Sequence, residues 1–347
     1  MLKWMALSAI GTAQCCAVLN ELAPGRRLDA TAAWVYTKHA GDASDAAAQK
    51  ATWGAASPTC VDGLKQSPID IVTGDVAHAP VLKNSISLPS LSGHFVPKHS
   101  GHAFQLDADL TEKKKPNKIG PTDYQFVQVH WHTPAENTID GERAAMEGHF
   151  VHSSTSGSAT YLAVVAVLYD LSPTCNEVLD DFWDQFPTDA ARMAPPTGYV
   201  PLGDMVVPLL HGGFWQWTGS LTTPPCTEGV EWVMLKKRLS VCQRQVDRLK
   251  LGLGNVQAGV DVNNRATNPL NHRVVADDSD GSITTSFVAS MPVGGASKSP
   301  STATWLTGGA LILVAAGLSA WKWMVLTKQQ SLQPVEFEDE GARYSSI

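Results

Sequence analysis

The feature that most constrains the fold of this chain is a series of short apolar segments separated by turn-forming residues, which runs over residues 51–276. Two of these segments, 126–132 and 161–169, are rich in β-branched and aromatic residues and are bounded by Gly, Pro, Asp or Ser. Segments of this length and composition are typical of β-strands. Two others, 176–186 and 243–250, have the apolar spacing of helices. The pattern therefore predicts a mainly β domain over 51–276 with a few short helices.

The N-terminal part of the chain differs from this central region. Lys3 precedes a mostly apolar stretch, and residues 1–23 as a whole are typical of a secretory signal peptide. A disordered or amphipathic leader is the alternative interpretation. Residues 24–50 are Ala-rich and weakly patterned, so we expect a loosely ordered lead-in to the domain.

The C-terminal part predicts a membrane anchor. Residues 277–302 are rich in Ser, Asp, Gly and Thr, as in a flexible linker. The apolar stretch 303–326 is long enough for a bilayer, which needs about 20 residues, and tryptophans lie near both of its ends. Lys322 and Lys328 favour a cytoplasmic location for the acidic tail, 327–347, because positive charge collects on that side. We therefore expect a single-pass type I membrane protein whose central domain is extracellular or lumenal. The alternatives are a buried helix of a soluble domain and a removed lipid-anchor signal, against which the polar tail argues.

The net charge bears on the partners that this protein can bind, and the cysteine content bears on its cellular compartment. The net charge of −7 gives no electrostatic reason to expect nucleic acid as a partner. Outside the predicted signal peptide the cysteines are Cys60, Cys175, Cys226 and Cys242. Four cysteines in an exported protein permit three pairings into two disulfides, and the spacing does not choose among them.

The strongest chemical signal is a group of histidines on two predicted strands. Side chains two residues apart share one face of a strand, so Gln128, His130 and His132 share a face, as do Glu147 and His149. If the two strands are antiparallel neighbours, three imidazoles converge and leave one open position, as in a catalytic zinc site. Gln128 and Glu147 can each accept the second ring N–H of a histidine and orient it. The alternative to zinc is cobalt or another divalent ion. The alternative to a metal site is a pair of strands with unrelated histidines.

The order of motifs along the central domain resembles that of the alpha-class carbonic anhydrases. The matching segments are 66–70, 100–104, 128–132, 135–139, 147–149, 219–225, 231–232, 263–265 and 268–270. The resemblance implies a central, largely antiparallel twisted sheet of about ten strands with short peripheral helices. It implies reversible hydration of carbon dioxide to bicarbonate and a proton by zinc-bound hydroxide. Asn137 departs from the pattern, because many members have histidine there.

The resemblance also assigns roles to individual residues. It implies that zinc is held by His130, His132 and His149. It implies that Thr222 accepts a hydrogen bond from the attacking hydroxide and donates to an ionised Glu136. His102 matches the proton-shuttle position, which suits an imidazole whose pKa is about 6.5; His94 and His99 are nearby alternatives.

Substrate contacts and disulfides follow from the same resemblance. The implied substrate-binding residues are Val151, Val164, Leu221, Thr222, Thr223 and Trp232. Secreted members carry cysteines at the positions of Cys60 and Cys226, which suggests that these two are bonded. Cys175 and Cys242 are then left to pair with each other, which is our own inference.

Two other classes of protein are the alternatives. One is a carbonic anhydrase-related binding or receptor ectodomain with little activity, although all three predicted ligands, Thr222 and Glu136 are retained. The other is a zinc peptidase, which usually carries His-Glu-x-x-His on a helix, and this sequence has no such motif.

Overall fold

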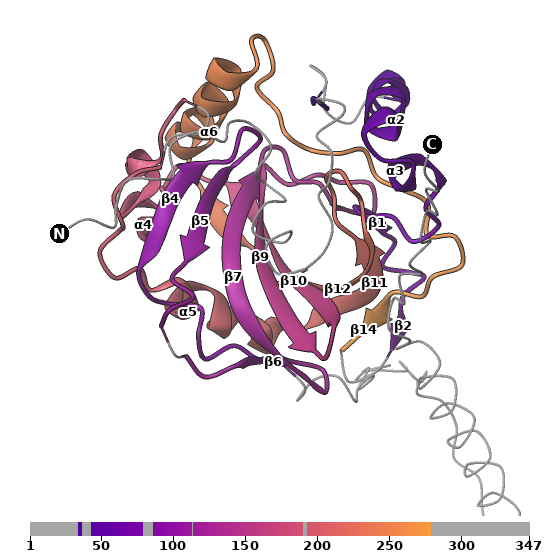
Figure 1. Ribbon diagram of the computed structural model, residues 1–347, viewed down its shortest axis with the longest axis horizontal. Coiled ribbons are helices and arrows are strands. Elements are labelled where there is room, and N and C mark those ends of the chain that lie inside the picture. The colour runs from indigo at the N-terminus through magenta and orange to yellow at the C-terminus, as the bar shows by residue number, and fades with distance from the viewer. Residues whose placement is uncertain (1–33, 37–42, 79–85, 113, 190–192, 279–347) are drawn as a thin grey trace, which may run out of the picture. The chain divides into compact units, whose positions relative to one another are not determined.

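The computed structural model describes residues 34–36, 43–78, 86–112, 114–189 and 193–278 (Figure 1). The predicted signal peptide 1–23, membrane span 303–326 and tail 327–347 lie outside the described residues, as does all of the predicted linker after residue 278. Within the described part of the protein, no helix combines the length and the apolar character needed to cross a membrane.

The domain is built on one sheet of 12 strands, which confirms the predicted mainly β class. Its middle consists of β7 (Thr122–His132), β9 (Met146–Ser156), β10 (Ala159–Leu171), β11 (Phe214–Ser220) and β12 (Glu228–Leu235). Its other strands are β2 (Ala77–His78), β3 (Ile86–Ser87), β4 (Phe95–His99), β5 (Phe104–Ala108), β6 (Asn117–Ile119), β13 (Leu239–Val241) and β14 (Ala276–Asp277). A separate pair joins β1 (Asp70–Ile71) to β8 (Thr138–Ile139).

Most of the strand pairs are antiparallel, along the order β2-β14-β11-β12-β10-β9-β7-β5-β4 (Figure 1). Strand β10 pairs in parallel with β12 and β13, and β14 pairs in parallel with β2. The sheet is therefore mixed. Several of its members have only two or three residues, which explains why the strand total exceeds the expected number.

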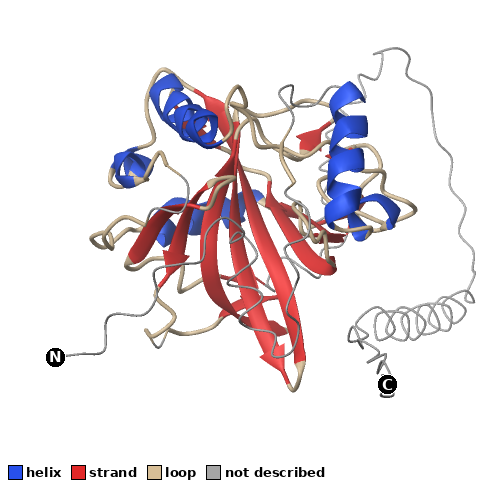
Figure 2. Cartoon of the chain, turned by 45° about the horizontal axis from the view of Figure 1, so that its top comes forward, coloured by secondary structure: helices blue, strands red, loops and turns tan. Residues whose placement is uncertain are grey.

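The two faces of the sheet bury different side chains because successive residues of a strand point to opposite faces. Phe150, Val165 and Val167 belong to the larger core cluster, while their neighbours Val151 and Val164 belong to a second cluster that contains three tryptophans. Helices border the sheet (Figure 2). They are α2 (Ala43–Ala56), α3 (Thr59–Asp62), α4 (Glu177–Asp180), α5 (Leu202–Val206) and α6 (Gln243–Val256), with the 3₁₀ helices η2 (Trp183–Gln185) and η3 (Val207–Gly212).

Four predicted boundaries change. Helix α2 begins within the range 24–50, which we expected to be loosely ordered. Its alanines favour a helix. The buried Gln49 side chain also donates a hydrogen bond to the Asn264 carbonyl and accepts one from the Ala266 N–H. The predicted helix 176–186 is split into α4 and η2, whereas α6 exceeds its predicted length. At the C-terminal end, β14 continues into the first residue of the predicted linker.

Two disulfides are present, Cys60–Cys226 and Cys175–Cys242. They choose one of the three pairings that the cysteine count left open. The family resemblance suggested the first bond, and the second is the one that we inferred for the remaining two cysteines. The bonded cysteines are 166 and 67 residues apart in the sequence. Cross-links over such distances stabilise a fold mainly by restricting the unfolded polypeptide.

Candidate metal centre

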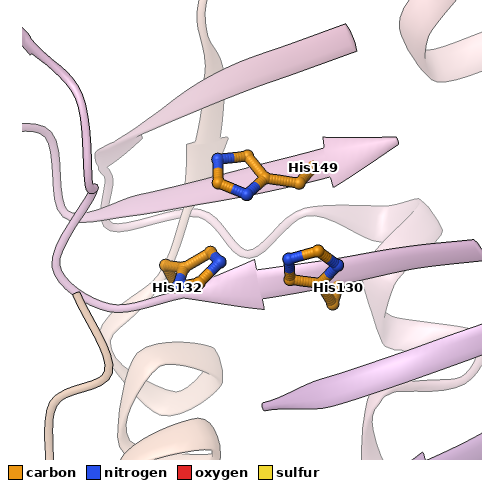
Figure 3. Close-up of side chains that lie close together, drawn as sticks. All are labelled: His130, His132 and His149. Atoms are coloured by element: carbon orange, nitrogen blue, oxygen red, sulfur yellow. The ribbon is translucent and has the colours of Figure 1, made fainter. Parts of the chain in front are cut away.

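His130, His132 and His149 converge on one point at the middle of the sheet (Figure 3). His130 and His132 lie on β7, and His149 lies on β9 directly opposite His130 in the antiparallel register. One ring nitrogen from each residue lies within 4.8 Å of the others. The alternation of side chains along two paired strands is thus sufficient to bring the three rings together, as the sequence predicted.

Each ring is oriented by an acceptor on its outer side. His130 Nδ1 lies 2.9 Å from Gln128 Oε1, and His149 Nε2 lies 2.9 Å from Glu147 Oε1. His132 Nδ1 lies 2.6 Å from the carbonyl oxygen of Asn263. Because these oxygens accept hydrogen bonds, the nitrogens facing them carry the ring protons, and the opposite nitrogens present lone pairs. The sequence predicted Gln128 and Glu147 but missed Asn263, because a backbone carbonyl leaves no residue signature.

The three histidines are held in the neutral form. Burial is the largest effect: it lowers the pKa of His132 to about 4 and the pKa values of His130 and His149 well below 6.5. His132 Nε2 is buried and has no hydrogen-bond partner among the described residues. An unsatisfied buried lone pair, beside two similar nitrogens, fits a metal ion with a preference for imidazole, and three such ligands fit zinc.

Glu136 is fully buried beside the three rings. Its Oε1 accepts a hydrogen bond from the Arg265 N–H at 2.8 Å, and its Oε2 lies 3.5 Å from His132 Nε2 and 3.9 Å from His149 Nδ1. Burial raises the pKa of Glu136 to about 8, and the hydroxyl of the buried Thr222 and the Arg265 N–H oppose that rise. The structure thus brings Glu136 and Thr222 together at the histidine cluster. A divalent cation there would favour the ionised carboxylate further.

The Glu147 carboxylate accepts hydrogen bonds on both of its oxygens, which fix its position. Its Oε2 accepts from the N–H groups of Glu136 and Asn137 at 2.7 and 2.8 Å, and Asn137 Nδ2 donates to Oε1 at 2.6 Å. These bonds partly offset burial, which raises the pKa of Glu147. Asn137 stands where the sequence departs from the family pattern. Its neutral side-chain amide donates a hydrogen bond to Glu147, the carboxylate that orients His149.

The predicted substrate residues lie on the same side of the sheet as the histidines. Val151, Val164 and Trp232 are buried in the second core cluster, and Leu221 packs against it. The Trp232 ring meets the His149 ring edge-on, with a centroid distance of 4.9 Å. Thr223 is half-buried, and its carbonyl accepts the Cys226 N–H at 2.8 Å. The cluster therefore has an apolar side next to His149.

His102, the predicted shuttle, is stacked on Trp34 with a centroid distance of 3.8 Å. Burial, followed by the charge of His99, lowers its pKa to about 4. His99 is buried with a similarly lowered pKa, whereas His94 is exposed just before β4. In this position the His102 imidazole is neutral at pH 7 and a weaker base than a free histidine.

Comparison with known proteins gives a consistent family. A family model described as eukaryotic-type carbonic anhydrase matches residues 48–279. The carbonic anhydrase of Klebsiella pneumoniae is 32% identical over 228 residues, which cover 65% of this chain and 86% of the relative. Alpha carbonic anhydrase 3 of Arabidopsis thaliana is 33% identical over 233 residues, which cover 65% of this chain and 77% of the relative.

A solved structure agrees with these relatives. The alpha-carbonic anhydrase of Thermovibrio ammonificans, in complex with the inhibitor sulfanilamide, is 25% identical, with a TM-score of 0.58. The match covers 71% of this chain and 99% of that one. The family match spans most of the protein and includes all three histidines, both carboxylates and Thr222. This chain therefore belongs to the eukaryotic-type carbonic anhydrase family.

Proposed function

We propose that this protein catalyses the reversible hydration of carbon dioxide to bicarbonate and a proton, with zinc held by His130, His132 and His149. The observation that carries this proposal is the convergence of three neutral imidazoles, with one ring nitrogen of each within 4.8 Å of the others. Zinc held by these three neutral ligands would lower the pKa of a bound water to about 7, far below that of bulk water, and so would supply a nucleophile at neutral pH.

Thr222 and Glu136 would orient that nucleophile. Glu136 accepts a hydrogen bond from the Arg265 N–H and lies beside the Thr222 hydroxyl. An ionised Glu136 can therefore also accept a hydrogen bond from Thr222. The Thr222 oxygen is then left as an acceptor, and the direction of the nucleophile's lone pair is fixed. The apolar side formed by Val151, Val164, Leu221 and Trp232 suits carbon dioxide, which has no hydrogen-bond donor and gains from leaving water.

His102 would return the proton to solvent. Its pKa of about 4 in the stacked position makes it a poor proton acceptor at pH 7. Relay through His102 therefore requires the ring to leave Trp34 for better-hydrated surroundings, where the pKa of an imidazole is close to about 6.5.

The proposal is tested on the purified full-length protein by zinc analysis and by stopped-flow carbon dioxide hydration. We expect about one zinc per molecule and hydration activity, with both lost in His130→Ala. A zinc-free wild type without hydration activity would instead support a binding domain of this fold.

The membrane placement is a separate proposal that rests on hydropathy. We infer that residues 303–326 span a membrane once, with the catalytic domain on the extracellular or lumenal side. In sealed vesicles whose outer face corresponds to the cytoplasmic side of the membrane, an added protease should remove an epitope placed after residue 327 and leave the catalytic domain intact. Digestion of the catalytic domain with protection of that epitope contradicts this topology.

A further inference from the structure

Arg143 is a partly buried residue just before β9, and the sequence analysis gave it no role. Its Nη1 donates hydrogen bonds to two consecutive backbone carbonyls, those of Ala135 and Glu136; the second distance is 2.8 Å. Its charge also acts on Glu136, Glu147 and Asp70. One guanidinium nitrogen therefore holds the backbone on both sides of the buried Glu136.

The same two peptide groups bind Glu147 through their other ends. The Ala135 carbonyl belongs to the peptide group that contains the Glu136 N–H, and the Glu136 carbonyl to the group that contains the Asn137 N–H. Both N–H groups donate to Glu147 Oε2, at 2.7 and 2.8 Å. In a planar trans peptide group the C=O and the N–H point in opposite directions. Arg143 and Glu147 therefore act on opposite sides of the same two peptide groups.

This arrangement places a cation and an anion at the two ends of two parallel hydrogen-bonded paths. A positive charge on the carbonyl oxygens polarises the peptide groups and strengthens the N–H donors that face the carboxylate. Glu147 in turn accepts from the His149 ring, whose other nitrogen faces the predicted metal position. The path from Arg143 to His149 is thus continuous through named hydrogen bonds.

Arg265, the other arginine near Glu136, serves a different part of the site. Its guanidinium donates to the carbonyls of Cys60 and Ser67 and to Gln66 Oε1, whereas its backbone N–H donates to Glu136. Those guanidinium bonds tie the segment around the Cys60–Cys226 disulfide. Arg265 therefore does not substitute for Arg143 at the two peptide groups that hold Glu147.

We propose that Arg143 is a positioning residue of the metal centre: its guanidinium clamps the two peptide groups that flank Glu136 and, through their N–H groups, holds the Glu147 carboxylate against His149. The inference rests on the proposed function, because His149 must be a metal ligand for the clamp to matter. It predicts that the loss of Arg143 loosens metal binding without removing any ligand.

The test compares full-length Arg143→Ala and Arg143→Lys with the wild type. The matched control is Arg248→Ala, since Arg248 also donates to backbone carbonyls, those of Asp184 and Phe186, but away from the histidines. The measurements are the rate of zinc release to a chelator, the visible absorption spectrum after cobalt substitution, and kcat and KM for carbon dioxide. We expect Arg143→Ala to release zinc about tenfold faster and to change the cobalt spectrum, because lost orientation of a ligand typically costs that much.

The control and the lysine variant make the result specific. Arg248→Ala should match the wild type in zinc release and spectrum, and Arg143→Lys, which keeps the charge, should lie between wild type and Arg143→Ala. A folded Arg143→Ala with the zinc release rate and cobalt spectrum of the wild type overturns the inference. If Arg143→Ala does not fold, Arg143→Gln replaces it: faster zinc release than from Arg143→Lys supports the inference, and equal rates overturn it.

The proposed function fails in a different way. A wild type that holds no zinc and hydrates no carbon dioxide overturns the proposed function and this inference together. A zinc-loaded, active wild type whose Arg143 variants behave like Arg248→Ala overturns the inference alone.

Discussion

The His132 ring is oriented by a backbone group from far along the sequence: its Nδ1 lies 2.6 Å from the carbonyl oxygen of Asn263, 131 residues later. The Asn263 side chain fixes that carbonyl. Its Oδ1 accepts the Thr133 N–H at 2.7 Å, and its Nδ2 donates to the carbonyls of His102 and Trp131 at 2.9 Å. A single buried amide thus anchors the segment that orients one of the predicted zinc ligands.

Asn263→Ala should therefore weaken zinc binding as well as the fold. Three hydrogen bonds are lost and their partners are left unsatisfied, so we expect the free energy of unfolding to fall by about 1–3 kcal/mol. Zinc should be released about tenfold faster, because the acceptor for His132 Nδ1 loses its fixed position. Thermal unfolding and chelator competition measure the two effects. A loss of stability with unchanged zinc release would show that the carbonyl holds its place without the side chain.

Thr222→Val is expected to lower kcat/KM for carbon dioxide hydration by about 100-fold. Valine keeps the shape of the buried side chain but removes the hydroxyl that links the nucleophile to Glu136. Zinc content should stay at the wild-type level, since the clustered ligand atoms come from the three histidines. Thr222→Ser, which keeps a hydroxyl, is the matched control and should retain most of the activity. Equal activity of the two variants contradicts the proposed gate.

His102→Ala should lower kcat in weakly buffered solution, and added imidazole should partly restore it. The reason is that a small diffusible base with a pKa near neutral can accept the proton in place of the missing side chain. Zinc content should be unaffected. Stopped-flow hydration at several imidazole concentrations measures the effect. An unchanged kcat in His102→Ala moves the shuttle to another group.

Acid should destabilise the fold through His152, which is buried on β9 with its ring near Phe126 of the larger core cluster. Burial lowers the pKa of His152 from 6.5 to about 4, so the unfolded protein binds this proton more tightly than the folded protein. The contribution of His152 to the free energy of unfolding should therefore be constant above about pH 6.5 and should fall as the pH drops towards about 4, by about 3 kcal/mol for a shift of this size.

The measurement is urea unfolding at a series of pH values. In His152→Phe, which keeps a ring at this position but cannot titrate, the fall between about pH 6.5 and about pH 4 should be smaller. Other buried histidines contribute to the acid response of both proteins, so the difference between the two curves is the relevant quantity. Parallel curves would mean that His152 does not contribute.

The sequence by itself determined the β class of the domain and the three clustered histidines. Both follow from local rules: alternation places His130 and His132 on one face of a strand, and Glu147 and His149 on one face of the next. Gln128 and Glu147 were predictable as orienting partners for the same reason. Family motifs added Thr222 and Glu136, which lie with the histidines in the structure, and the Cys60–Cys226 bond.

Only the tertiary structure decided the contacts that hold this cluster in place. The Asn263 carbonyl, the peptide groups between Arg143 and Glu147, and the stacking of His102 on Trp34 all join separate segments of the sequence. Every residue except proline carries the same backbone carbonyl and N–H groups, so the residue type does not reveal which of them faces a ligand. Local side-chain patterns therefore select the reactive groups, whereas the packing of distant segments fixes their orientation and their pKa values.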